Sequence, residues 1–353
     1  MNVKSENQRQ KPARKQGCEA LIFHPCLRAG FCLFLCVALL VQSLAAFETD
    51  QYNLPSAPLA DIGDEVSEYT LENLREAMNE LNAEIAKRGI SEKRLMYLRS
   101  DEAIAKKVFN ELGAGIVPFT KAQSWVNSHK FKAQPVRYKT GYGDSIYRFV
   151  PSNYFTISAT VNLYGASFGT DKIAHFFQQG FTYYKKYKNG LKNGLSESDA
   201  RKKAVRWGEF SEKTYFGTLV SGVYANGDLA ANYAGMKFYE NLTHEIRIGE
   251  TVKPPVFVLR EGFWTLSAAD NLLKPFMTNH FNEALNPSKL SFFLRSTVRG
   301  TLRKKACKTW RERFSNLSKQ DFENITNNLK LWHGEDYGFS ESDNFITIAG
   351  VCF

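Results

Sequence analysis

Residues 170–187 read TDKIAHFFQQGFTYYKKY. Thr170 is placed to cap a helix that runs to about Tyr187, and most of the stretch is apolar or aromatic. Within it, Asp171 and His175 stand four residues apart, so both project from one face of the helix. Because ionisable groups are costly to bury, this pair indicates a functional site or a necessary polar network.

A second apolar helix with a polar pair begins at Asn226–Gly227 and ends near Leu242. Residues 227–235 read GDLAANYAG, in which Asp228 and Asn232 again stand four residues apart and share one face. The repetition of this spacing indicates that the two helices contribute to one polar cluster.

The helix between these two is expected to begin after Ser196, with Asp199 at capping-box spacing, and to run to about Val220. It offers Glu209 and Glu212, three residues apart, and the helix phase permits either to face its neighbours. Three consecutive helices with short connections pack side by side in bundles. We therefore expect their polar faces to meet.

The residue types in this cluster suit acid–base or metal chemistry. A carboxylate beside an imidazole can act as a base with its orienting group, or as a pair of metal ligands. The candidate catalytic residues are His175, Asp171, Glu209, Glu212, Asp228 and Asn232. The candidate ligands for a divalent metal are Asp171, His175, Glu212 and Asp228.

The alternative interpretation is purely structural. Asp171 and Asp228 both lie in the first turn of a helix, where a carboxylate complements the helix dipole. His175 and Asn232 would then be hydrogen-bonded residues of the core. His129, His280 and His333 have no suitable companions nearby in the sequence, which also lacks the HExxH, GxSxG, P-loop and paired CxxC motifs.

The order Asp-Lys-x-x-His, then Glu, then Gly-Asp-Leu-x-Ala-Asn-x-x-Gly resembles the VanZ-like proteins and the related YfiM-type envelope proteins. The resemblance covers about residues 165–240. It implies a polar site and a location in the cell envelope, and it supplies no reaction. The matching residues are Asp171, Lys172, His175, Glu209 or Glu212, Asp228, Leu229, Ala231, Asn232 and Gly235.

The first 45 residues have the composition of a secretory signal peptide. A basic start is followed by an apolar run from Phe31 to Val41 and by small residues at Ser43 and Ala45. We predict cleavage near Ala45 or Ala46 and a secreted or periplasmic product; the alternative is a chain anchored by its uncleaved N-terminal segment. The run is shorter than the roughly 20 residues that a spanning helix needs.

Only Cys307 and Cys352 follow this segment, since the other four cysteines lie within it. Two cysteines in an oxidising compartment are most simply one disulfide, which here would join the C-terminus to a basic helix. The alternative is two separate thiols.

The remaining chain predicts a mainly α fold. We expect a linker over 46–66, N-terminal helices over 67–130, and a central helical core with a helical C-terminal extension over 131–353. Turn residues and short aromatic runs over about 131–165 indicate a small β or irregular segment. Leu71, Leu74, Met78, Leu81 and Ile85 mark an apolar helix seam, and Ser91, Ser100 and Thr120 are expected helix caps.

The formal net charge is +10, and residues 1–45 hold six basic and two acidic residues, so a mature chain keeps an excess of six positive charges. Basic residues concentrate over 295–313, where they form either a solvated face or a surface for anionic lipid or cell-wall polymer. We expect no nucleic-acid partner, because no binding motif accompanies the charge. Two hypotheses follow: a non-catalytic envelope protein with a structural or ligand-binding polar centre, and a metal-assisted hydrolase acting on an envelope substrate.

Overall fold

Helix α10 (Asn226–Asn241) is buried along its whole length. The computed structural model describes residues 48–353 except 116–118, 150–153, 155–156, 215–221, 268 and 343–344, and the described residues belong to one compact unit. A helix that is covered on every side needs small or apolar residues all round. Ala230, Ala231 and Ala234 meet that need, and the polar residues of α10 must find partners inside the protein.

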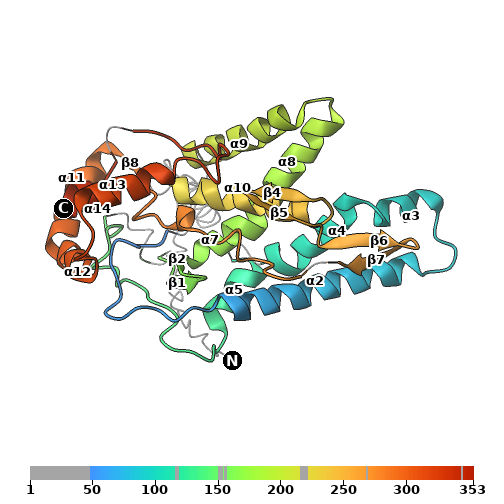
Figure 1. Cartoon of the computed structure of the whole chain (residues 1–353), viewed down its shortest axis with the longest axis horizontal. Coiled ribbons are helices and arrows are strands. Elements are labelled where there is room, and N and C mark those ends of the chain that lie inside the picture. The colour runs from blue at the N-terminus through green and yellow to red at the C-terminus, as the bar shows by residue number, and fades with distance from the viewer. Residues whose placement is uncertain are drawn as a thin grey trace, which may run out of the picture. The chain divides into compact units, whose positions relative to one another are not determined.

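The other two helices that the sequence assigned to the polar cluster both pack against α10 (Figure 1). Helix α7 (Thr170–Ala174) passes through a π-helical turn, η2 (His175–Gln179), into α8 (Gly180–Lys192). Helix α9 (Glu197–Lys213) packs on α8, and the Ser196 side chain caps it as predicted. Its expected continuation to Val220 falls largely on residues outside the described part of the chain.

Helices α8 and α10 approach each other at a pair of glycines. A Cβ atom on Gly180 would lie 2.6 Å from the Cα of Gly235, and one on Gly235 would lie 2.0 Å from the carbonyl oxygen of Phe176. Both distances are shorter than van der Waals contact, so any larger residue would push the helices apart. This close approach sets the spacing at which the polar faces of the two helices meet.

The N-terminal helices follow the predicted caps. Ser91, Ser100 and Thr120 each accept a hydrogen bond from a backbone amide in the first turn of the next helix. The first helix starts before its predicted apolar seam, at Gly63. The elements are α2 (Gly63–Ile85), α3 (Glu92–Leu98), α4 (Asp101–Val108), η1 (Phe109–Gly113) and α5 (Lys121–Ser128).

From Glu48 onward, the segment 46–66 packs against the protein, although its composition is that of a linker. Residues 48–52 are buried, and Glu48 forms a β-bridge with Ile157. Helix α2 already begins within the expected linker. The composition of the segment, with Pro55, Pro58 and scattered acids, concealed that its polar side chains have partners in the interior.

The strands form short two-stranded antiparallel sheets, consistent with the predicted mainly α fold. The first is a hairpin that begins within the small β or irregular segment predicted over about 131–165 and leads directly into α7. The pairs are β1 (Thr160–Leu163) with β2 (Ala166–Gly169), β3 (Val223–Tyr224) with β8 (Lys289–Leu290), β4 (Ile246–Ile248) with β5 (Thr251–Lys253), and β6 (Phe257–Arg260) with β7 (Phe263–Leu266).

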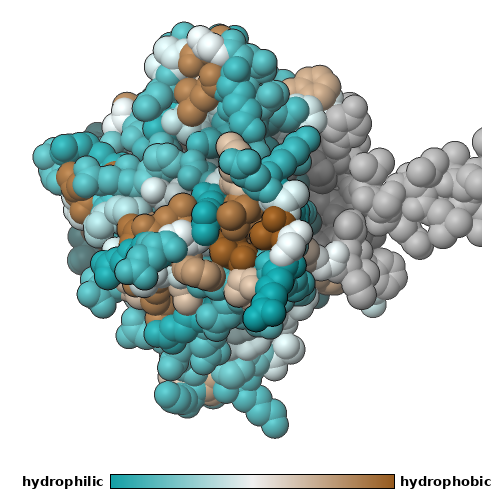
Figure 2. All heavy atoms as spheres, turned by 90° about the vertical axis from the view of Figure 1, so that its right-hand side faces the viewer, coloured by the Kyte–Doolittle hydropathy of each residue, from teal (hydrophilic) through white to brown (hydrophobic). Residues whose placement is uncertain are grey.

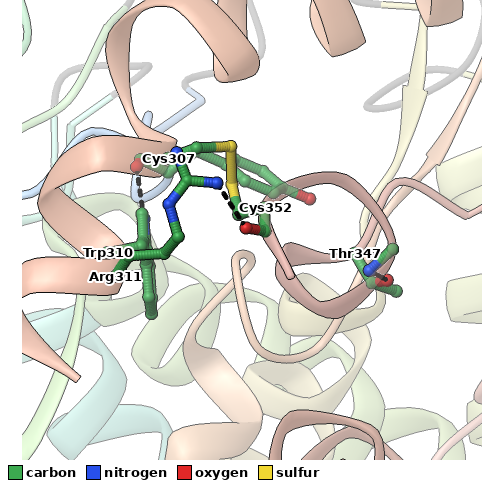
Figure 3. The surroundings of a disulfide bond; sticks show 7 residues. Cys307, Trp310, Arg311, Thr347 and Cys352 are labelled. Atoms are coloured by element: carbon green, nitrogen blue, oxygen red, sulfur yellow. Dashed lines mark hydrogen bonds between the residues drawn. A yellow bond between two sulfur atoms is a disulfide. The ribbon is translucent and has the colours of Figure 1, made fainter. Parts of the chain in front are cut away.

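The C-terminal helices pack around a second apolar cluster and are joined by the predicted disulfide between Cys307 and Cys352 (Figure 3). Beside it, the Arg311 guanidinium donates to the Cys352 carbonyl at 2.8 Å, and the Trp310 indole donates to the Tyr52 carbonyl. The last elements are η3 (Asn279–Phe281), α11 (Phe292–Lys305), α12 (Cys307–Arg313), α13 (Lys319–Asn328) and α14 (Ile348–Cys352).

Within the described part of the chain, none of the helices combines the length and the apolar character needed to cross a membrane. The expected signal segment, residues 1–45, and its cleavage near Ala45 or Ala46 lie outside the described residues.

Candidate functional site

The centre of the polar cluster is the ammonium group of Lys172. Its Nζ atom lies 2.6 Å from Asp171 Oδ2 and 2.6 Å from Asp228 Oδ1, and it donates to Glu283 Oε1. The lysine side chain is completely buried, and so is that of Glu283. A buried ammonium group needs such partners, because its desolvation costs several kcal/mol.

Three separate parts of the chain supply these groups. Asp171 and Lys172 lie at the start of α7, immediately after β2, and Asp228 lies in the first turn of α10. Glu283 follows η3, more than 100 residues further along the chain than Lys172. The α7–α10 pair was expected from the sequence, whereas Glu283 was not.

A further layer of hydrogen bonds orients the carboxylates. Thr49 Oγ1 donates to Asp171 Oδ1, and the Tyr147 hydroxyl donates to Glu283 Oε2 at 2.7 Å. The backbone amide of Glu283 donates to the side-chain oxygen of Gln51. Thr49 and Gln51 belong to the expected linker, so no signal in the sequence pointed to their role.

The proximity of Thr49 to Asp171 depends on Gly169. A Cβ atom at this position would lie 2.0 Å from Thr49 Oγ1 and 2.1 Å from Asp171 Oδ1. The residue that ends β2 must therefore be glycine for the threonine to reach the carboxylate.

The carboxyl group of Glu283 holds its proton more tightly than usual. Burial raises the pKa of Glu283 to about 7, against the opposing effect of the Lys172 ammonium. For Lys172 itself, burial acts to lower the pKa, but the three neighbouring carboxylates together hold it well above its ordinary value. Lys172 is therefore a permanent cation at the centre of the cluster.

His175 lies on the other side of Asp228, in the π turn η2. Its Nδ1 atom lies 3.1 Å from Asn232 Oδ1, and its Nε2 atom lies 3.4 Å from Asp228 Oδ2. The amide oxygen can only accept, so this contact places a proton on Nδ1 and leaves Nε2 directed at the carboxylate. The side chain of His175 is 16% exposed, in contrast to the buried carboxylates.

Glu212 completes this side of the cluster. It is buried, and neither of its carboxylate oxygens makes a hydrogen bond of normal geometry with the described residues. Burial and the charge of Asp228 raise its pKa well above the ordinary value, which Lys172 and the nearby Ala225 amide offset only in part. Glu209, the alternative from the sequence, is only partly buried and lies beside Gly338.

Two groups of side chains could therefore hold a cation, and they share Asp228. Ligand atoms of His175, Glu212 and Asp228 lie within 4.8 Å of one another, and so do those of Asp171, Asp228 and Glu283. The predicted ligand set of Asp171, His175, Glu212 and Asp228 is thus divided between two neighbouring groups. Lys172 contacts all three carboxylates of the second group and takes the position that a metal would need.

His280 and His333 lie near each other in the fold, but neither belongs to a group of possible metal ligands among the described residues. Their ring centroids lie 6.2 Å apart, and His280 Nε2 donates to the Leu331 carbonyl at 2.9 Å. Burial lowers the pKa of His280 to about 4, so it stays neutral. His280 is a hydrogen-bonded residue of the core.

No family model, no curated protein and no solved structure matches this chain. The resemblance to VanZ-like and YfiM-type proteins over residues 165–240 therefore stays a prediction.

Proposed function

We propose that this chain is an envelope protein whose polar centre binds a divalent metal ion through His175, Glu212 and Asp228. The observation that carries the proposal is Glu212, a buried carboxyl group close to His175 and Asp228 whose oxygens make no hydrogen bond of normal geometry with the described residues. Buried carboxylates that lack both hydrogen bonds and a cationic partner are strongly disfavoured, and a metal ion would satisfy this one.

The charge balance of the cluster also favours a cation. Asp171, Asp228, Glu283 and Glu212 surround a single ammonium group, that of Lys172. Protons or an additional cation must balance the remaining negative charge. A mixed set of one imidazole nitrogen and two carboxylates suits a transition metal such as Zn²⁺ or Mn²⁺ better than Mg²⁺.

The test is calorimetric titration of the purified, metal-stripped protein with ZnCl₂ and MnCl₂. We expect near-stoichiometric binding that His175→Ala and Glu212→Gln abolish while the circular dichroism spectrum stays that of the parent. Glu209→Gln is the matched control, because it removes a carboxylate from the same helix outside the group. Binding of equal affinity in Glu212→Gln, or no binding by the parent, would contradict the proposal.

A metal-assisted hydrolase acting on an envelope lipid or cell-wall substrate is the second candidate. It is favoured by the partial exposure of His175, which gives this side of the cluster a route to solvent. Three protein ligands would leave coordination positions for water and substrate. Hydrolysis of model esters and phosphodiesters by the metal-loaded protein, lost on chelation and in His175→Ala, would establish it.

We also propose that helices α11 and α12 contact an anionic lipid or cell-wall polymer. Arg299, Arg303 and Lys304 of α11 are exposed and form no ion pair with the described residues. Other cations of the basic segment 295–313 are used within the protein: Lys305 pairs with Asp144, and Arg313 donates to the Pro55 carbonyl. The surface offered to a partner is therefore the exposed face of α11.

A further inference from the structure

A small hollow between α4 and α8 has lysines at its edge and aromatic rings at its base. Its volume is about 310 Å³, within the range of small-ligand sites. Lys106 comes from α4 and Lys185 from α8, and Phe181 and Tyr184 lie beneath them. This hollow is separate from the polar cluster, since none of the cluster residues lines it.

The two lysines are not neutralised by the rest of the protein. Neither Lys106 nor Lys185 forms an ion pair or a hydrogen bond with the described residues, whereas the neighbouring Lys188 pairs with Asp101 at 2.9 Å. The ammonium groups of Lys106 and Lys185 each lie 5.8 Å from the centroid of the Phe181 ring. Two unpaired cations therefore converge over one aromatic ring.

Tyr184 contributes a buried side chain to the hollow. The Tyr184 side chain is buried, and its hydroxyl has no hydrogen-bond partner among the described residues. The features of the hollow that suit an anion are therefore the two lysines without ion pairs.

Exposed apolar side chains lie beside this hollow. Tyr97 lines it and is 41% exposed, and the adjacent Met96 is 69% exposed. Leu259 and Phe263, each at least 40% exposed, lie near the turn of the β6–β7 hairpin. Figure 2 faces the side that carries α3 and this hairpin, and it shows an apolar area surrounded by hydrophilic residues.

Two hydrogen bonds hold α3 and the hairpin together as one surface. Arg99 Nε donates to the Gly262 carbonyl at 2.8 Å, and Trp264 Nε1 donates to the Leu98 carbonyl at 2.9 Å. The apolar side chains of the two elements are therefore carried by a rigid support next to the hollow.

We propose that this side of the protein docks on a membrane that contains anionic phospholipid. Lys106 and Lys185 bind the lipid phosphate, and Met96, Tyr97, Leu259 and Phe263 enter the interface. Apolar side chains lose water when they enter the headgroup boundary, and nearby cations are attracted by the negative surface. A soluble anion would use the lysines but would leave the apolar side chains in water.

The test is co-sedimentation of the full chain with vesicles of phosphatidylcholine, with and without phosphatidylglycerol. At about 1 kcal/mol per lysine near an anionic surface, Lys106→Ala and Lys185→Ala should each weaken binding about 5-fold, and together about 30-fold. Met96→Ser with Phe263→Ser should also release the protein. These side chains are exposed, so we expect unchanged melting temperatures.

The matched control is Lys202→Ala with Lys203→Ala, which removes two exposed charges from α9 and should leave vesicle binding unchanged. Arg303→Ala with Lys304→Ala tests the α11 surface proposed above. Loss of vesicle binding through this pair but not through Lys106 and Lys185 would overturn the proposal and place the contact on the basic helices. Equal binding to vesicles without phosphatidylglycerol would overturn it as well. Binding of glycerol phosphate to the hollow without vesicle binding would show a site for a soluble anion instead.

Discussion

The two sides of Asp228 balance the same kind of charge in opposite ways. On one side, Lys172 places its own ammonium group among Asp171, Asp228 and Glu283, and all of these side chains are almost completely buried. On the other side, Glu212 has no ion pair and no hydrogen bond of normal geometry within the described residues, and His175 reaches solvent. The first side is complete by itself, and we propose that the second takes a metal ion.

Lys172→Met should have the largest effect, because it leaves three buried carboxylates without their cation. Breaking a buried ion-pair network by removing one partner costs about 3–5 kcal/mol. Urea denaturation of parent and variant measures this loss in the free energy of unfolding. A loss below about 1 kcal/mol would show that the carboxyl groups are protonated and that the Lys172 ammonium does not balance their charge.

A second substitution sharpens the result. In Lys172→Met, Glu283→Leu removes one of the buried charges left without a cation and should restore part of the lost stability. A divalent ion should also stabilise Lys172→Met more than it stabilises the parent, since the lysine no longer takes the position among the carboxylates.

The pH dependence of stability should follow from Glu283. Its pKa is raised from 4.5 to about 7, so between these values the folded protein holds a proton that the unfolded chain has released. The contribution of this group therefore makes the protein less stable as pH rises through that window, by on the order of 3 kcal/mol. Denaturation midpoints should fall over this range in the parent and fall less in Glu283→Gln.

Glu212 acts in the same direction, since its pKa is also raised. A residual slope in Glu283→Gln should therefore disappear when Glu212→Gln is added. A midpoint that rises with pH in the parent, after correction for His280, would contradict the assignment of protonated carboxyl groups to this cluster.

Asn232→Ala tests the open side alone. The contact between Asn232 Oδ1 and His175 Nδ1 orients the imidazole, and loss of such a supporting contact typically weakens metal binding about 10- to 100-fold. Calorimetric titration with Zn²⁺ measures the change. If the two sides of Asp228 are independent, Asn232→Ala leaves the pH dependence due to Glu283 unaltered. A change in both the zinc affinity and this pH dependence would mean that the two sides act as one unit.

Glu209→Gln should have the smallest effect. Glu209 lies on the same helix as Glu212 but outside both carboxylate groups, so its substitution should change stability by less than about 0.5 kcal/mol. Metal affinity should also stay at the parental value. A large loss of affinity would reassign the glutamate of the open side from Glu212 to Glu209.

Local patterns in the sequence predicted much of the fold. Ser91, Ser100, Thr120 and Ser196 cap helices because their side chains accept hydrogen bonds within a few residues, a property that depends little on the rest of the protein. The same applies to the four-residue spacing of Asp228 and Asn232 on α10. The structure brings both to the cluster, as the shared helix face predicted.

The partners that complete the site could not be predicted, because they come from distant irregular segments. Thr49 and Gln51 lie in a stretch with the composition of a linker, and Glu283 and Tyr147 carry no helical spacing that would link them to α7. Helix phase left Glu209 and Glu212 equivalent, and only the packing of α9 against its neighbours distinguishes them. Lys172 was recognised as part of a motif, but its role as a built-in cation depends on Glu283.

The π turn η2 makes the length of this part of the chain as important as its composition. A regular α-helix advances about 100° per residue, and a π turn accommodates one extra residue within an otherwise α-helical segment. Deletion of Gln178 alone would let the segment become regular and would rotate everything before it by about that angle relative to α8. His175 and Asp171 would then turn away from α10 without any change in their identity, so the chemistry of the cluster depends on a residue count.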